Sequence, residues 1–210
     1  LPGQRSGGFL FEIYIMEKIN LLDLAQQADP VNQLELIRLN ADELPVIPFT
    51  AEVVSAKVHY CNEDEIHGYV HCNEPDCILC RIGRKQDERY LLPAYLPTLK
   101  SIGILPISPS MQPHALLPQL LEVLQQLDEE KPKVLFIRRE GLTKFLVTTS
   151  PVIDGIEAGE SKIKAFLEKL ETGAIDLASV FNHLNNQQLV AVSSIADTLR
   201  LKGIDPDALD

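Results

Sequence analysis

Four cysteines of this 210-residue chain lie within one twenty-residue stretch, from Cys61 to Cys80. Three histidines stand in or beside it, at His59, His67 and His71. Cysteine at this local density, beside histidine, is typical of a metal site, and a Cys-x-x-Cys pair is its most specific part. A chain that closes around a metal ion must bring these residues together. The cluster therefore constrains the fold more than any other feature.

Three ligands follow from spacing and turn chemistry. Cys77 and Cys80, followed by Gly83, can direct both thiolates at one ion from a tight turn. Cys72 precedes them by a short run whose Asn, Pro and Asp residues favour a turn. The spacing leaves the fourth ligand open among His59, Cys61, His67 and His71. Four protein ligands predict a closed structural zinc (Zn²⁺) site, which does not activate water.

Composition and motifs exclude several classes of function. The formal net charge of -11 and the isoelectric point of about 4.9 disfavour indiscriminate binding of polyanions. The sequence has no P-loop, dinucleotide-binding glycine motif, G-x-S-x-G elbow or H-E-x-x-H, so we predict that it is not an enzyme. Clustered cysteines without a signal peptide favour a reducing, cytoplasmic location, and no apolar run is long enough to predict a membrane partner.

Three segments differ in character. Residues 1–15 are expected to be a leader or tag-like segment, with Met16 as the native start. Residues 16–150 are expected to form the core, with a zinc subdomain over about 59–83. Strands are predicted over 34–39, 52–60, 66–72, 90–95, 101–107, 133–138 and 144–149, and helices over 17–30 and 112–127. This order predicts an α+β fold, a small antiparallel barrel or curled sheet with a helix across one end.

Residues 151–210 are expected to form an acidic helical appendage. They hold ten acidic and five basic residues. Apolar residues at helical spacing predict one helix from about residue 160 and another from about 189 to 203.

Basic residues gather in two stretches that also hold aromatic rings, the combination that single-stranded nucleic acid needs. The first stretch contains Arg81, Arg84, Lys85, Arg89 and Lys100 with Tyr90 and Tyr95. The second contains Lys131, Lys133, Arg138, Arg139 and Lys144 with Phe136 and Phe145. Cations can follow the phosphates while the rings stack on bases, so these stretches predict a nucleic-acid interface.

The cysteine spacing carries a family resemblance. His59, twelve intervening residues, Cys72 and then Cys77-x-x-Cys80 resemble the zinc-containing core of the helix-destabilising single-stranded DNA-binding protein of T-even bacteriophages. The order of elements is similar over about residues 34–172. The resemblance implies that His59 is the fourth zinc ligand.

The same resemblance implies an OB-like antiparallel β-barrel with an inserted zinc-binding loop and C-terminal helices. It also implies a basic cleft for single-stranded DNA, with Tyr69, Tyr90 and Phe145 as cleft aromatics. The predicted nucleic-acid-binding residues are then Tyr69, Arg81, Arg84, Lys85, Arg89, Tyr90, Tyr95, Arg138, Arg139 and Phe145.

The expected function is sequence-tolerant single-stranded DNA binding in replication or recombination, in a bacterial or phage-infected cell. The acidic C-terminal helices are expected to contact replication or recombination proteins. The alternatives are a zinc-ribbon-like adaptor between proteins and a single-stranded RNA binder.

Overall fold

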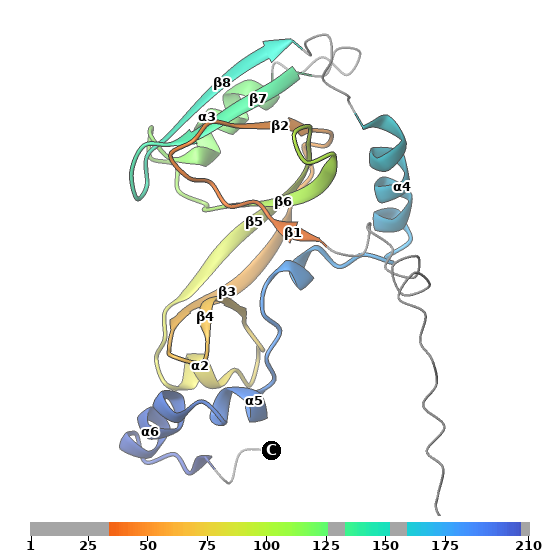
Figure 1. The fold of residues 1–210 in the computed structure, drawn as a ribbon. Coiled ribbons are helices and arrows are strands. Elements are labelled where there is room, and N and C mark those ends of the chain that lie inside the picture. Colours follow the sequence, from red (N-terminus) through yellow and green to blue (C-terminus); the bar gives the residue numbers. More distant parts are fainter. Residues whose placement is uncertain (1–33, 126–132, 152–158, 207–210) are drawn as a thin grey trace, which may run out of the picture.

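The computed structural model describes residues 34–125, 133–151 and 159–206 (Figure 1). Its strands are β1 (Glu35–Leu36), β2 (Leu44–Pro48), β3 (Val54–Asn62), β4 (His67–His71), β5 (Gln86–Leu96), β6 (Ser101–Ile107), β7 (Lys133–Arg139) and β8 (Phe145–Pro151). Its helices are α2 (Ile78–Arg81), α3 (Leu116–Leu124), α4 (Glu160–Glu171), the 3₁₀ turn η1 (Leu177–Val180), α5 (Asn186–Val190) and α6 (Ser193–Leu201). The predicted α+β class is confirmed. The predicted leader and the helix over 17–30 lie outside the described residues.

The strands form one mixed sheet that does not close. Its order is β1-β6-β5-β2-β7-β8, with β3 beside β5 and β4 beside β3. Every pair is antiparallel except β1 with β6. Among the described strands, β8 pairs only with β7, so the sheet is open and a closed barrel is not seen.

Strand β5 is the spine of the sheet. Its second half pairs with β6 over residues 90–96, and its first half pairs with β3 over residues 86–91. Because these two pairings overlap, β3 and β6 lie on opposite edges of β5. Strand β2 takes the β3 edge further along, at Tyr95 and Ala94. The β3–β4 hairpin and α2 therefore extend away from the main sheet on the first half of β5 (Figure 1).

Four apolar clusters lie in the described parts of the chain, and three of them bear on the positions of the helices. Helix α3 covers the main sheet, where buried residues include Leu92, Leu105, Leu120 and Leu135. Beside it, Phe166 of α4 meets Phe49 edge to face, with ring centroids 5.7 Å apart. The third cluster lies under the cysteines and is shared with α5 and α6, and it includes Cys61, Val70, Ile78, Leu79, Leu189, Ile195 and Leu199. The C-terminal helices thus contribute to the interior on which the cysteine loop rests.

Strand β2 was not among the predicted strands, because its sequence Leu-Pro-Val-Ile-Pro holds two prolines that cannot donate ladder hydrogen bonds. It forms because Val46 and Ile47 are almost completely buried between β5 and β7. The helix predicted over 189–203 is instead two helices, α5 and α6, separated at Ala191 and Val192.

We expect Phe166→Ala to lower the free energy of unfolding by about 3–5 kcal/mol, because it empties a fully buried site against the sheet. Urea unfolding followed by circular dichroism measures this change. Lys164→Ala, on the exposed side of the same helix, is the control and should change stability little. Equal losses in both variants would contradict the packing of α4 described above.

Candidate metal centre and basic cleft

The four predicted zinc ligands converge on one point. His59 lies on β3, Cys72 directly follows β4, Cys77 caps α2 and Cys80 lies within it. One nitrogen or sulfur atom from each residue lies within 4.8 Å of all the others. Gly83 ends the turn with a φ of 80°, the left-handed conformation that favours glycine. These four residues can hold a metal ion.

Three of the six distances between ligand atoms are close to the edges of a zinc tetrahedron. His59 Nε2 lies 3.5 Å from Cys77 Sγ and 3.4 Å from Cys80 Sγ. Cys72 Sγ lies 3.6 Å from Cys80 Sγ. Zinc–sulfur bonds of about 2.3 Å and zinc–nitrogen bonds of about 2.0 Å give tetrahedral edges of about 3.5–3.8 Å. These three edges therefore fit a tetrahedrally coordinated zinc ion.

Neighbouring groups orient two of the ligands. His59 Nδ1 lies 3.0 Å from the Lys85 carbonyl oxygen. A carbonyl only accepts hydrogen bonds, so Nδ1 carries the proton and Nε2 presents its lone pair to the cysteines. Gln86 Nε2 donates to Cys72 Sγ at 3.2 Å. Both supporting residues stand at the start of β5, which ties the ligand cluster to the spine of the sheet.

Two of the ligand thiols, those of Cys72 and Cys80, resist ionising by themselves. Burial, with the neighbouring thiols of Cys72 and Cys77, raises the pKa of Cys80 to about 12. Burial also raises the pKa of Cys72. Thiolates are the form that binds metal, and a bound dication supplies the positive charge that keeps several of them ionised together. The site is therefore suited to a cation that displaces thiol protons on binding.

The three rival ligands lie outside this group. Cys61 is buried in the apolar cluster under the hairpin. His67 is exposed, with its ring centroid 6.1 Å from that of Tyr60. His71 stacks on His183 at 4.5 Å. The structure places His59, and none of these three, beside the cysteines.

A cleft of about 750 Å³ lies where the hairpin meets the main sheet. Among the described residues that line it are three arginines, Arg38, Arg89 and Arg139, and no acidic residue. Tyr69 and Phe145 supply two aromatic rings. A lining that is cationic and acid-free, in a chain of net charge -11, indicates a local site for anions.

Hydrogen bonds and ring contacts hold the cleft side chains in place. Arg89 Nη2 donates to Tyr69 Oη at 2.6 Å, and its guanidinium carbon lies 4.8 Å from the Tyr69 ring centroid. Arg139 donates to the carbonyl oxygens of Gly141 and Leu142, at 2.8 and 2.9 Å, in the β7–β8 turn. Both arginines are thus fixed before any ligand arrives, which lowers the entropy cost of binding.

Four of the ten predicted nucleic-acid-binding residues line this cleft: Tyr69, Arg89, Arg139 and Phe145. Four other basic candidates lie outside the lining and pair with acidic side chains: Arg81 with Asp76, Arg84 with Glu63, Lys85 with Asp87 and Arg138 with Glu140. Within the cleft, Arg89 also pairs with Asp87, at 3.5 Å. Arg38 was not among the predicted residues. It lies in an apolar run, and nothing in its local sequence signals that the fold brings it beside Arg139.

The two remaining tyrosines face the interior. Tyr90 is half-buried against the cluster under α3. Tyr95 is completely buried, and a Cβ atom at Gly159 would lie 2.4 Å from its ring. Because α4 begins directly over this ring, Tyr95 does not meet solvent and is not part of the cleft surface. This burial is a tertiary effect that the sequence did not reveal.

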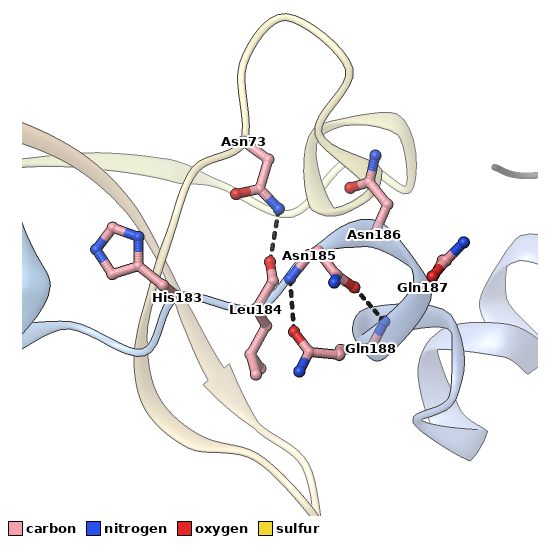
Figure 2. A pocket seen from close by; sticks show the side chains of 7 residues that line it. All are labelled: Asn73, His183, Leu184, Asn185, Asn186, Gln187 and Gln188. Atoms are coloured by element: carbon pink, nitrogen blue, oxygen red, sulfur yellow. Dashed lines mark hydrogen bonds between the residues drawn. The ribbon is translucent and has the colours of Figure 1, made fainter.

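A second cavity, of about 510 Å³, lies between the loop after β4 and α5 (Figure 2). Four of the five amide side chains that line it are hydrogen-bonded within the protein. Asn73 Nδ2 donates to the Leu184 carbonyl oxygen at 2.6 Å, and Asn185 and Gln188 cap α5 reciprocally (Figure 2). Asn186 Nδ2 donates to the Asp76 carbonyl oxygen at 2.9 Å. These amides fasten the C-terminal helices to the cysteine loop.

In the described parts of the chain, no helix has both the length and the apolar character needed to cross a membrane. Comparisons with protein-family models, curated proteins and solved structures found no match. The resemblance noted from the cysteine spacing stays a prediction, and the function is argued from the geometry.

We expect His59→Ala to lose bound metal, because it removes one of four converging ligands. Metal content per chain, measured by plasma emission spectrometry on purified protein, gives the result. His71→Ala removes a nearby imidazole that stacks only on His183 and should retain the metal. Full metal content in His59→Ala, or its loss only in His71→Ala, would show that the ligand set is wrong.

Proposed function

We propose that this protein binds single-stranded DNA in the cleft, with little sequence preference, in replication or recombination. The observation that carries the proposal is the lining, in which three arginines and two aromatic rings gather without an acidic residue. Arginines neutralise phosphates and rings stack on bases, and neither contact depends strongly on base identity.

The arrangement of strands supports an OB-like core, open between β6 and β8. Strand β2 pairs with β5 and β7, β5 pairs with β6, β7 pairs with β8, and α3 joins β6 to β7. In this correspondence the hairpin and cysteine loop are inserted between the first and second core strands. OB-folds bind oligonucleotides on the face of strands 2 and 3 and with the loops 1-2 and 4-5.

Part of the cleft lining comes from those same places. Arg89 lies on β5, the second core strand, and Pro106 on β6, the third. Tyr69 comes from the insertion between the first two strands, and Leu142 from the loop between β7 and β8. This correspondence supports an oligonucleotide as the ligand.

Zinc is the metal we propose, with a structural role. Three thiolates and one imidazole at tetrahedral spacing are a donor set that zinc prefers, and four protein ligands leave no open position. His59 and Cys72 are tied to Lys85 and Gln86, which begin the strand that carries Arg89 to the cleft. The metal would thereby order one wall of the cleft.

We expect oligo-dT labelled with fluorescein to bind in an anisotropy titration at low salt. Affinity should fall as salt rises, with a log–log slope of about -2 if the three arginines each neutralise a phosphate on a single strand. No binding at micromolar protein would remove the proposal and favour the adaptor alternative. A matched oligo-U titration decides between DNA and RNA as the preferred ligand.

Adjacent arginines on β7 give a matched pair of variants. Arg139 lines the cleft, whereas Arg138 pairs with Glu140 outside it, at 2.8 Å. Arg139→Gln should weaken binding by about tenfold, since it removes a charged hydrogen bond to phosphate. Arg138→Gln changes the net charge equally and should have a much smaller effect. Equal effects would mean that only the overall charge matters and the cleft is not the site.

Removal of the metal by a chelator is expected to weaken oligo-dT binding and to lower the melting temperature together. The reason is that the metal would hold the hairpin that carries Tyr69 against the start of β5, the strand that carries Arg89. Anisotropy and thermal melting before and after chelation, with zinc added back as the control, measure both. If metal-free protein bound oligo-dT with unchanged affinity, the claim that the metal orders one wall of the cleft would be wrong.

A further inference from the structure

We propose that Tyr60 is a second base-stacking position beyond the cleft, so that a bound single strand continues from Tyr69 across the β3–β4 hairpin. This inference rests on the proposed function and extends its binding path. Tyr60 was not among the residues predicted from the sequence. The sequence predicts strands over 52–60 and 66–72, but not which of their residues lie opposite each other.

The two tyrosines are register partners in the hairpin. Tyr60 on β3 lies opposite Tyr69 on β4, and their ring centroids are 5.4 Å apart at an interplanar angle of 71°. Tyr69 lines the cleft. A base that leaves the cleft past Tyr69 therefore meets Tyr60 next, without a gap between the two surfaces.

Tyr60 is 49% exposed, and it alone among the phenylalanine and tyrosine side chains of the described residues is in the exposed class. The exposed imidazole of His67 lies beside it, with ring centroids 6.1 Å apart. A single exposed tyrosine on a strand is ordinary on a protein surface. Tyr60 differs because its ring contacts both Tyr69, which lines the cleft, and His67, so that the three rings form one continuous surface.

The row of rings is anchored at its inner end. Phe181, only 4% exposed, meets Tyr69 edge to face at 5.9 Å, and Arg89 holds the Tyr69 hydroxyl. The chain beyond Phe181 also pairs with β4, where Asn182 bridges Val70. Tyr60 therefore projects from a hairpin that is paired along both edges, by β5 and by Asn182, and a rigid ring loses little entropy when a base stacks on it.

Charge sets the outer limit of the surface. The turn between β3 and β4 carries Glu63, Asp64 and Glu65. Arg84 pairs with Glu63, while Asp64 and Glu65 are exposed. Carboxylates repel phosphates, so we place the end of the path at Tyr60 and His67.

The test is an anisotropy titration of Tyr60→Ala and Tyr60→Phe with oligo-dT ligands of increasing length. Tyr60→Ala should bind short oligonucleotides as the wild type does and lose about tenfold in affinity for longer ones, the order expected for one stacked base. Tyr60→Phe keeps the ring and should restore most of the loss. Cross-linking with 5-iododeoxyuridine placed near one end of a long oligo-dT should label the peptide that contains Tyr60.

The outcomes separate this inference from the proposed function. If the wild type binds no oligo-dT, both fail. If it binds but Tyr60→Ala matches it at every length, the inference alone fails. A loss that is equal for short and long ligands would place Tyr60 inside the first binding position, or report damage to the hairpin, and would also overturn the proposal.

Discussion

The hydrogen-bond ladder of β5 is the constraint on which the other parts of this structure depend. One edge of the strand carries β3 and then β2, and the opposite edge carries β6. The same strand begins at the two residues that support His59 and Cys72, and it presents Arg89 to the cleft. Only a few residues of one ladder therefore separate the candidate metal ligands from the cleft. The ligand cluster and the cleft share this strand.

The hairpin and cysteine loop are too small to bury an adequate core by themselves. Helices α5 and α6 supply the missing apolar surface, with Leu189, Ile195 and Leu199 completely buried against the loop. The candidate metal ligands lie at one side of this apolar cluster. At another side, hydrogen bonds from the amides of Asn73 and Asn186 hold the cysteine loop to the C-terminal segment. Helix packing thus stabilises the same loop that a bound metal ion would hold. Residues that lie more than a hundred positions apart in the sequence complete a site whose ligands are local.

The features predicted correctly from the sequence are those that depend on residues close together in the chain. The converging set of Cys72, Cys77 and Cys80 followed from spacing and turn residues, and β6 was predicted with its observed bounds. His59 was chosen through a family resemblance, because spacing alone left four candidates.

Tertiary packing decided the rest. Strand β2 forms despite two prolines because its middle residues are buried between two partners. Tyr95 is an aromatic residue in a basic stretch of the sequence, which suggested a base-stacking role, yet the start of α4 covers its ring. Arg38 and Tyr60 acquire their positions from strand pairing over long separations, which no local pattern encodes.

An acidic chain can nevertheless offer a cationic cleft, because screening limits the reach of exposed charges to about 8 Å at physiological salt. A strand in the cleft would then respond mainly to Arg38, Arg89 and Arg139, while the acidic remainder opposes binding at the surface outside it.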